Sequence, residues 1–124
     1  MKENKIKDDL DVVMDCVEKI FMVDQSRIRS KTRKADAVFA RHAYSVVCRD
    51  CTRRTYQEIA DSINRDHSTV VYSYNEGRNI ADLDPVFNAR IDMCKEVFRR
   101  ITTEALEESE SDIVKKVLEY LKNN

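Results

Sequence analysis

The segment that decides the fold of this chain reads Thr55-Tyr56-Gln57-Glu58-Ile59-Ala60-Asp61-Ser62-Ile63-Asn64-Arg65-Asp66-His67-Ser68-Thr69-Val70. Its first residues have the form of a capping box, a Thr followed three positions later by a Glu, which predicts the start of a short helix. Asp66 is a good N-cap for a second helix over about residues 67–78, with Val70 and Tyr74 facing inward. Two helices joined by about three turn residues predict a helix-turn-helix.

The start of the second helix carries polar side chains only. In a helix-turn-helix the second helix lies in the major groove of DNA, and its first residues touch the edges of the bases. A helix N-terminus also carries a partial positive charge that favours phosphate. The candidate contact residues are Arg65, Asp66, His67, Ser68 and Thr69. Spacing alone leaves the alternative open that these residues only cap a helix.

The rest of the chain also predicts helices. Apolar residues repeat at helical spacing over about residues 5–22, 34–51, 87–101 and 113–121, with a polar break over 107–112. Asp24-Gln25-Ser26 interrupts the pattern and predicts the cap of a short helix over 26–30. Asp82-Leu83-Asp84-Pro85 ends one helix and starts the next, with Pro at an early helical position. A single Pro and a single Gly supply too few turns for a many-stranded β protein. The one glycine, Gly77, also leaves no glycine-rich phosphate-binding loop, which argues against a nucleotide-dependent motor or dehydrogenase.

Charge is distributed unevenly along the 124 residues. The formal net charge is only −1, but residues 27–54 hold nine Lys or Arg against two acids, and the segments on both sides are acidic. A basic patch is the electrostatic footprint of nucleic-acid binding, although a solvated helical surface explains most charge runs.

Four stretches resemble the C-terminal DNA-binding domain of the bacterial replication initiator DnaA. Arg65-Asp66-His67-Ser68-Thr69-Val70 closely resembles the signature of that family, and residues 55–60 resemble its first motif helix. Arg41-His42 falls where the family usually has Arg-Gln, and residues 30–34 fall on its basic loop. The resemblance covers about residues 9–80, so we expect a stand-alone domain without the AAA+ ATPase module of the family.

The resemblance implies an all-helical bundle, similar to DnaA domain IV and to the Trp repressor, that binds a short AT-rich duplex element, the DnaA box. It implies that residues 66–69 face bases in the major groove and that Arg33 enters the adjacent minor groove. Arg41, Arg49 and Arg65 would anchor phosphates. Base chemistry agrees, because a helix-start Asp accepts from base amino groups, a Thr methyl packs on thymine, and Arg suits narrow AT-rich minor grooves. The full set of expected DNA contacts is Lys31, Arg33, Lys34, Arg41, His42, Arg49, Tyr56, Gln57, Arg65, Asp66, His67, Ser68 and Thr69.

The chain departs from the family at several of these positions. The family usually has a glycine pair before its Arg-Asp-His, whereas this chain is one residue shorter there, and we expect Asn64 to take the positive φ that glycine normally takes. Tyr56 and Gln57 replace a Leu-Pro-type pair, His42 replaces Gln, and Ser68 stands where Thr is commoner. These changes leave the preferred DNA sequence open.

No other site emerges from the sequence. Cys48 and Cys51 form a C-x2-C, but no second ligand pair follows and both lie on the inward stripe, so core packing is favoured over metal or redox chemistry. No nucleophile or acid accompanies His67, and we expect neither an enzyme nor a cofactor. No apolar run approaches the ~18 residues that span a bilayer, and the N-terminus does not resemble a signal peptide, so we expect a cytoplasmic protein.

We therefore predict an all-α helix-turn-helix domain over residues 1–104 and an additional C-terminal helix over 105–124. This last helix would pack on the domain or serve oligomerisation, so both a monomer and a homodimer stay open. The predicted function is sequence-specific binding of double-stranded DNA in replication initiation, its regulation, or transcription regulation. The alternative is a helical protein-interaction module that kept the scaffold and binds a replication protein.

Overall fold

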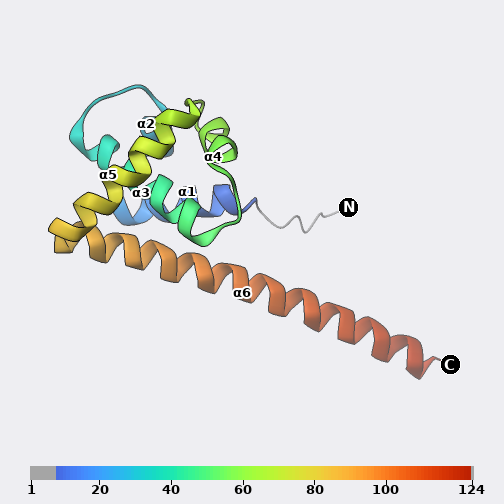
Figure 1. Cartoon of the computed structure of the whole chain (residues 1–124). Helices are drawn as coiled ribbons and strands as arrows, with labels where there is room; N and C mark the ends of the chain where they lie inside the picture. The colour runs from blue at the N-terminus through green and yellow to red at the C-terminus, as the bar shows by residue number, and fades with distance from the viewer. Residues whose placement is uncertain (1–7, 124) are drawn as a thin grey trace.

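The computed structural model describes the backbone of residues 8–123 and the side chains of residues 8–105 and 112–123. Across this range it has six helices and no strand, which confirms the all-α fold class. They are α1 (Asp9–Phe21), α2 (Gln25–Arg29), α3 (Ala35–Cys51), α4 (Tyr56–Ser62), α5 (His67–Leu83) and α6 (Pro85–Lys122). Helices α1 to α5 gather at one end of α6, whose C-terminal half extends away from the bundle (Figure 1).

Local sequence signals explain where most helices begin. Asp8, Asp24 and Asp84 precede α1, α2 and α6, and each carboxylate accepts backbone N–H groups of the following turn. Pro85 occupies the first position of α6, where its missing N–H costs nothing. The predicted capping box of α4 is confirmed: the Thr55 hydroxyl accepts from the Glu58 N–H at 3.1 Å, and the Glu58 carboxylate accepts from the Thr55 N–H at 2.9 Å.

Helix α3 is the centre of the bundle. Its seven consecutive residues 42–48 are all buried, so neighbouring helices cover every face of this stretch rather than the single stripe that the periodicity predicts. Most apolar residues of α1, α4 and the first part of α6 belong to the same buried core. The predicted apolar stripes also include Ile6, Ile20, Cys51, Tyr74 and Ile101. Ile20, Cys51 and Tyr74 are only half-buried and Ile101 is exposed, whereas Ile6 lies outside the described residues.

Helix α5 crosses α3 at very short range. A Cβ atom added to Gly77 would lie 2.7 Å from Val46 Cγ2 and 3.0 Å from the His42 carbonyl oxygen. These distances are shorter than the ~3.5–4.0 Å at which carbon atoms pack. The single glycine of the chain is therefore required by helix packing, and it sets the position of the second motif helix.

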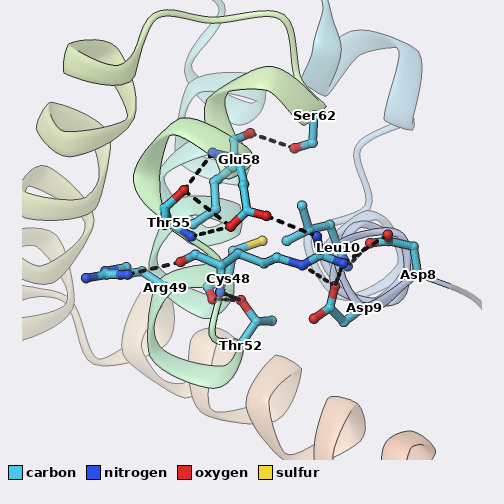
Figure 2. A network of polar contacts seen from close by, with 11 residues as sticks. Asp8, Asp9, Leu10, Cys48, Arg49, Thr52, Thr55, Glu58 and Ser62 are labelled. Carbon is cyan, nitrogen blue, oxygen red and sulfur yellow. Dashed lines mark hydrogen bonds and ion pairs between the residues drawn. The ribbon is translucent and has the colours of Figure 1, made fainter.

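Two polar networks connect the helices around this core. Arg54, in the loop before α4, donates to Asp9 at 3.0 Å, Asp8 at 3.1 Å and Glu58 at 3.4 Å, which joins the starts of α1 and α4 (Figure 2). Asp50 of α3 accepts from the Tyr74 hydroxyl at 2.8 Å and from Lys95 Nζ at 2.9 Å, which joins α3, α5 and α6.

The prediction of a break over residues 107–112 is wrong. Helix α6 runs without interruption from Pro85 to Lys122. Residues 107–112 include neither Gly nor Pro, and Glu is a good helix former, so the helix can continue through them. Their polarity shows that this part of the helix has left the bundle, not that the helix ends there. The apolar residues near its end are exposed, so they do not pack back on the domain: Ile113, Val114, Val117, Leu118 and Leu121. The division at residue 104 stays a prediction. Of the helices described, none is long and apolar enough to cross a membrane.

Candidate DNA-binding surface

The turn between α4 and α5 has the geometry of the predicted motif. Helix α4 ends at Ser62, and Asn64 adopts φ 53°, which confirms the expected positive φ at this position. The reversal is closed by a hydrogen bond from the Arg65 N–H to the Ala60 carbonyl at 2.9 Å. Asn is one of the few residues other than Gly that takes this conformation readily.

The first turn of α5 presents polar side chains to solvent. Asp66, His67, Ser68 and Thr69 are all exposed, whereas Val70, the next residue, is buried and anchors the helix start. Asp66 occupies the predicted N-cap position, but its side chain makes no capping hydrogen bond. It thus differs from Asp8, Asp24 and Asp84, whose carboxylates are engaged with their own helices. The Asp66 carboxylate is presented at the surface beside the N–H groups of the helix start.

The basic loop between α2 and α3 lies next to this turn, and its three basic side chains, Lys31, Arg33 and Lys34, are exposed. Hydroxyl groups shape the loop, because the Ser30 side chain accepts from the Thr32 N–H and the Thr32 side chain accepts from the Lys34 N–H. A bidentate ion pair between Arg27 and Asp36, with both N–O distances 2.8 Å, closes its base. Hydrogen bonding to the Arg27 guanidinium lowers the pKa of Asp36 to about 2.

Two of the arginines expected to hold phosphates bind backbone carbonyls instead. Arg41 donates to the Ile28 carbonyl at 2.7 Å and to the Ser30 carbonyl at 2.8 Å. Arg65 donates to the Ser30 carbonyl as well and, at 3.4 Å, to that of Arg29. Both side chains are half-buried, and burial together with the charge of Arg65 lowers the pKa of Arg41. These carbonyls end α2 and have no partner within their helix, so the arginines satisfy them and fix the basic loop against the turn.

His42 lies away from this surface. Only 8% of the residue is exposed, and Nδ1 is 2.6 Å from the hydroxyl of Ser73 on α5. Burial lowers the pKa of the imidazole. The expected DNA contact is therefore corrected: in this structure the ring joins α3 to α5 inside the bundle.

Arg49, Tyr56 and His67 come together from three helices. The Arg49 guanidinium carbon lies 4.5 Å from the centre of the Tyr56 ring, and the His67 ring lies 5.8 Å from it. Gln57, the next residue of α4, is exposed and donates to Asp61 at 2.8 Å. The part of the bundle around the turn is thus lined by residues 31–34, 49, 56–57 and 65–69. Of the expected contacts, only His42 is buried.

Sequence reasoning missed the residues that hold this surface in place. Arg29 donates to the Ser62 carbonyl and so joins the end of α2 to the end of α4. Arg54 joins α4 to α1 through three carboxylates. Their charge alone suggests that both side chains lie in solvent. Only the contacts in the folded structure distinguish an arginine that binds carbonyls from one that remains available to a ligand.

Cys48 and Cys51 belong to the core and not to the candidate DNA-binding surface. Cys48 is fully buried, which raises the pKa of its thiol well above the ordinary value, and Cys51 is half-buried. Among the described residues no group of three or more His, Cys, Asp or Glu side chains is placed to hold a metal ion.

Comparison with known proteins points to the same part of the chain. The family model described as the bacterial DnaA protein helix-turn-helix matches residues 10–76. Two proteins named chromosomal replication initiator protein DnaA are similar to this chain. The one from Lachnoclostridium phytofermentans is 30% identical over 92 residues, which cover 73% of this chain and 20% of that protein. The one from Sulfurimonas denitrificans is 27% identical over 104 residues, which cover 83% of this chain and 23% of that protein. The chain spans about a fifth of the length of these relatives.

Proposed function

Because the chain belongs to the bacterial DnaA helix-turn-helix family, we propose that it binds double-stranded DNA through the first turn of α5 and the basic loop. The observation that carries this proposal is the polar, exposed start of α5, with an N-cap carboxylate that its own helix does not use. Val70, which is buried directly behind this helix start, gives residues 66–69 a rigid support.

The proposed contacts divide into two kinds. Asp66, His67, Ser68 and Thr69 face base edges in the major groove, where a carboxylate accepts from an amino group and a Thr methyl packs on thymine. Arg33 reaches from the loop into the neighbouring minor groove, which is narrow and strongly negative in AT-rich DNA. These residues supply sequence preference.

The second kind of contact supplies affinity. Lys31, Lys34 and Arg49 are exposed cations around the turn and are proposed to bind phosphates. Arg41 and Arg65 contribute by holding the loop that carries these two lysines, because both guanidinium groups donate to its first carbonyl, that of Ser30. We propose a DnaA-box-like site as the target, with a role in replication initiation, its regulation, or transcription regulation.

Fluorescence anisotropy tests the proposal with two labelled duplexes, one carrying a DnaA box and one with the same bases scrambled, over a salt series. Tighter binding to the box that persists as salt rises supports it, and each phosphate contact adds roughly one unit to the slope of log K against log salt. No binding to either duplex at low salt contradicts it. Equal binding to both means that DNA binding holds but the site differs.

Matched variants assign the roles. Asp66→Ala should reduce the preference for the box by about 1–3 kcal/mol, because a base contact is lost. Asp82→Ala removes an equally exposed carboxylate at the other end of α5 and should leave the preference unchanged. Lys34→Ala should weaken binding to both duplexes alike.

The end of α6 favours a second candidate function, a protein-interaction module. At about 100° per residue, the apolar residues of 113–121 face roughly away from the side on which Phe87, Ile91 and Phe98 contact the bundle. A continuous helix cannot turn this face onto its own domain. Light scattering of the whole chain and of Val117→Asp/Leu121→Asp tests whether the partner is a second copy of the chain. A mass that falls to one chain in the variant supports self-association through this face, and a single chain in both proteins excludes self-association.

A further inference from the structure

Tyr56, the first residue of α4, lies at the junction of three helices. The Arg49 guanidinium from the end of α3 stacks over its ring at 4.5 Å. The rings of His67 and Tyr74, both from α5, lie 5.8 Å and 5.9 Å away at steep angles of 83° and 72°. One aromatic ring therefore touches an exposed cation from one helix and an exposed imidazole from another.

The ring itself is held firmly. Tyr56 is half-buried, and its neighbour Tyr74 is fixed by a 2.8 Å hydrogen bond to Asp50, which also accepts from Lys95 of α6. The peptide before Tyr56 belongs to the capping box, which fixes the start of α4. A side chain supported on two sides in this way can hold Arg49 and His67 in place.

Stacking leaves the arginine able to bind an anion. Arg49 uses one N–H group on the Arg54 carbonyl, at 3.0 Å, and its side chain is exposed. A cation–π contact with the face of a ring uses none of the guanidinium N–H groups, so the remaining ones can still donate to an anion. A side chain ordered before binding also loses less entropy when it meets a phosphate.

We infer that Tyr56 is a positioning residue that holds Arg49 at a DNA phosphate and His67 at the base edges as one unit. This inference rests on the proposed DNA-binding function. It assigns to Tyr56 a role through its neighbours in place of the direct base contact expected from the resemblance. It also gives a physical reason for an aromatic residue where the family usually has an apolar pair: the ring face binds a cation, which an aliphatic side chain does not do.

The test is a mutant cycle on the whole chain with the box and scrambled duplexes. Tyr56→Leu removes the ring and keeps an apolar side chain of similar size, and it should weaken binding to the scrambled duplex about 3- to 30-fold. In an Arg49→Ala background the same change should alter that binding by less than about 2-fold, because the stacked cation is already gone. Tyr56→Leu should also lower the ratio of box to scrambled affinity, since His67 loses its support.

Two variants separate positioning from damage to the fold. Tyr56→Phe keeps the stacking face and should restore most of the affinity that Tyr56→Leu loses. Phe39→Leu makes a similar exchange on α3, where the Phe39 ring lies 6.0 Å from that of Phe87 on α6, and should not change either affinity. Thermal unfolding of each variant shows that the protein measured is folded.

Three outcomes overturn the inference. Wild-type affinity of Tyr56→Leu for both duplexes shows that the ring positions nothing. An equal loss with and without Arg49 shows that Tyr56 acts through the fold alone, while the proposed function stands. Failure of the wild-type chain to bind either duplex removes the proposed function and the inference with it.

Discussion

Substitution of Gly77 by Ala tests whether the close crossing of α3 and α5 sets the position of the second motif helix. The added Cβ would lie 2.7 Å from Val46 Cγ2, about 1 Å inside normal carbon contact. The Val46 methyl can yield by a change of rotamer or a small shift. The His42 carbonyl oxygen, 3.0 Å from the same position, belongs to the backbone of α3 and can yield only if the helices separate.

The expected magnitude is the difference of two opposing effects. Overpacking of a well-packed core costs about 1–3 kcal/mol. Replacing Gly by Ala within a helix returns about 1 kcal/mol. We therefore expect the free energy of unfolding to fall by up to about 2 kcal/mol, and Tm by up to roughly 10 °C for a chain of this size. Because the polar start of α5 moves with the helix, affinity for the preferred duplex should also fall in the folded variant.

Thermal unfolding followed by circular dichroism measures the change, and two further variants locate its cause. Asn79→Ala, at an exposed position two residues later, reports the propensity gain alone and should raise stability by about 0.5 kcal/mol. In a Val46→Ala background the cost of Gly77→Ala should shrink by about 0.5–3 kcal/mol, because the nearest clash is removed. A Gly77→Ala protein that is about 1 kcal/mol more stable than wild type would refute the reasoning, since only the propensity gain would then operate.

Three further changes follow from single features of the structure. Asn64→Gly should leave stability within a few tenths of a kcal/mol, whereas Asn64→Ala should cost about 1–2 kcal/mol at φ 53°; equal urea midpoints for the two would contradict the role of the positive φ. Stability should fall as pH drops from about 6.5 towards 5, because burial lowers the pKa of His42 in the folded state and the unfolded chain takes up the proton first. The charge of Glu76 opposes this lowering of the pKa, and the charge of Arg41 adds to it. In chemical denaturation at pH 7.5 and 5.5, His42→Gln should reduce the difference in stability between the two pH values; the same difference as in the wild type would contradict this role of His42. Thr55→Ala removes one half of the capping box and should cost about 0.5–2 kcal/mol, measured by the same urea titration, with no loss expected if α4 were held by packing alone.

The sequence predicts those parts of the candidate site that are formed by residues adjacent in the chain. The residues of the first turn of α5 are adjacent in the sequence, so the side chains of 66–69 share an exposed turn whatever the helix packs against. Their exposure follows from their polarity, and the basic loop next to them was visible as a charge run. The roles of Arg41, Arg65 and His42 were not predictable in this way, because each depends on which backbone or side chain the fold brings within 3 Å.

The sequence by itself determined that the chain is helical and where most of its helices start. A capping box at Thr55, an N-cap at Asp24 and Asp84-Pro85 act through atoms a few residues apart, and Asn64 takes its positive φ for a reason contained in its own side chain. Only the tertiary structure decided which charges remain for a ligand. Arginines that look alike in the sequence differ in whether a helix end with unsatisfied carbonyls lies beside them, and a helix of mixed polarity continues past the bundle because backbone hydrogen bonds within α6 need no partner.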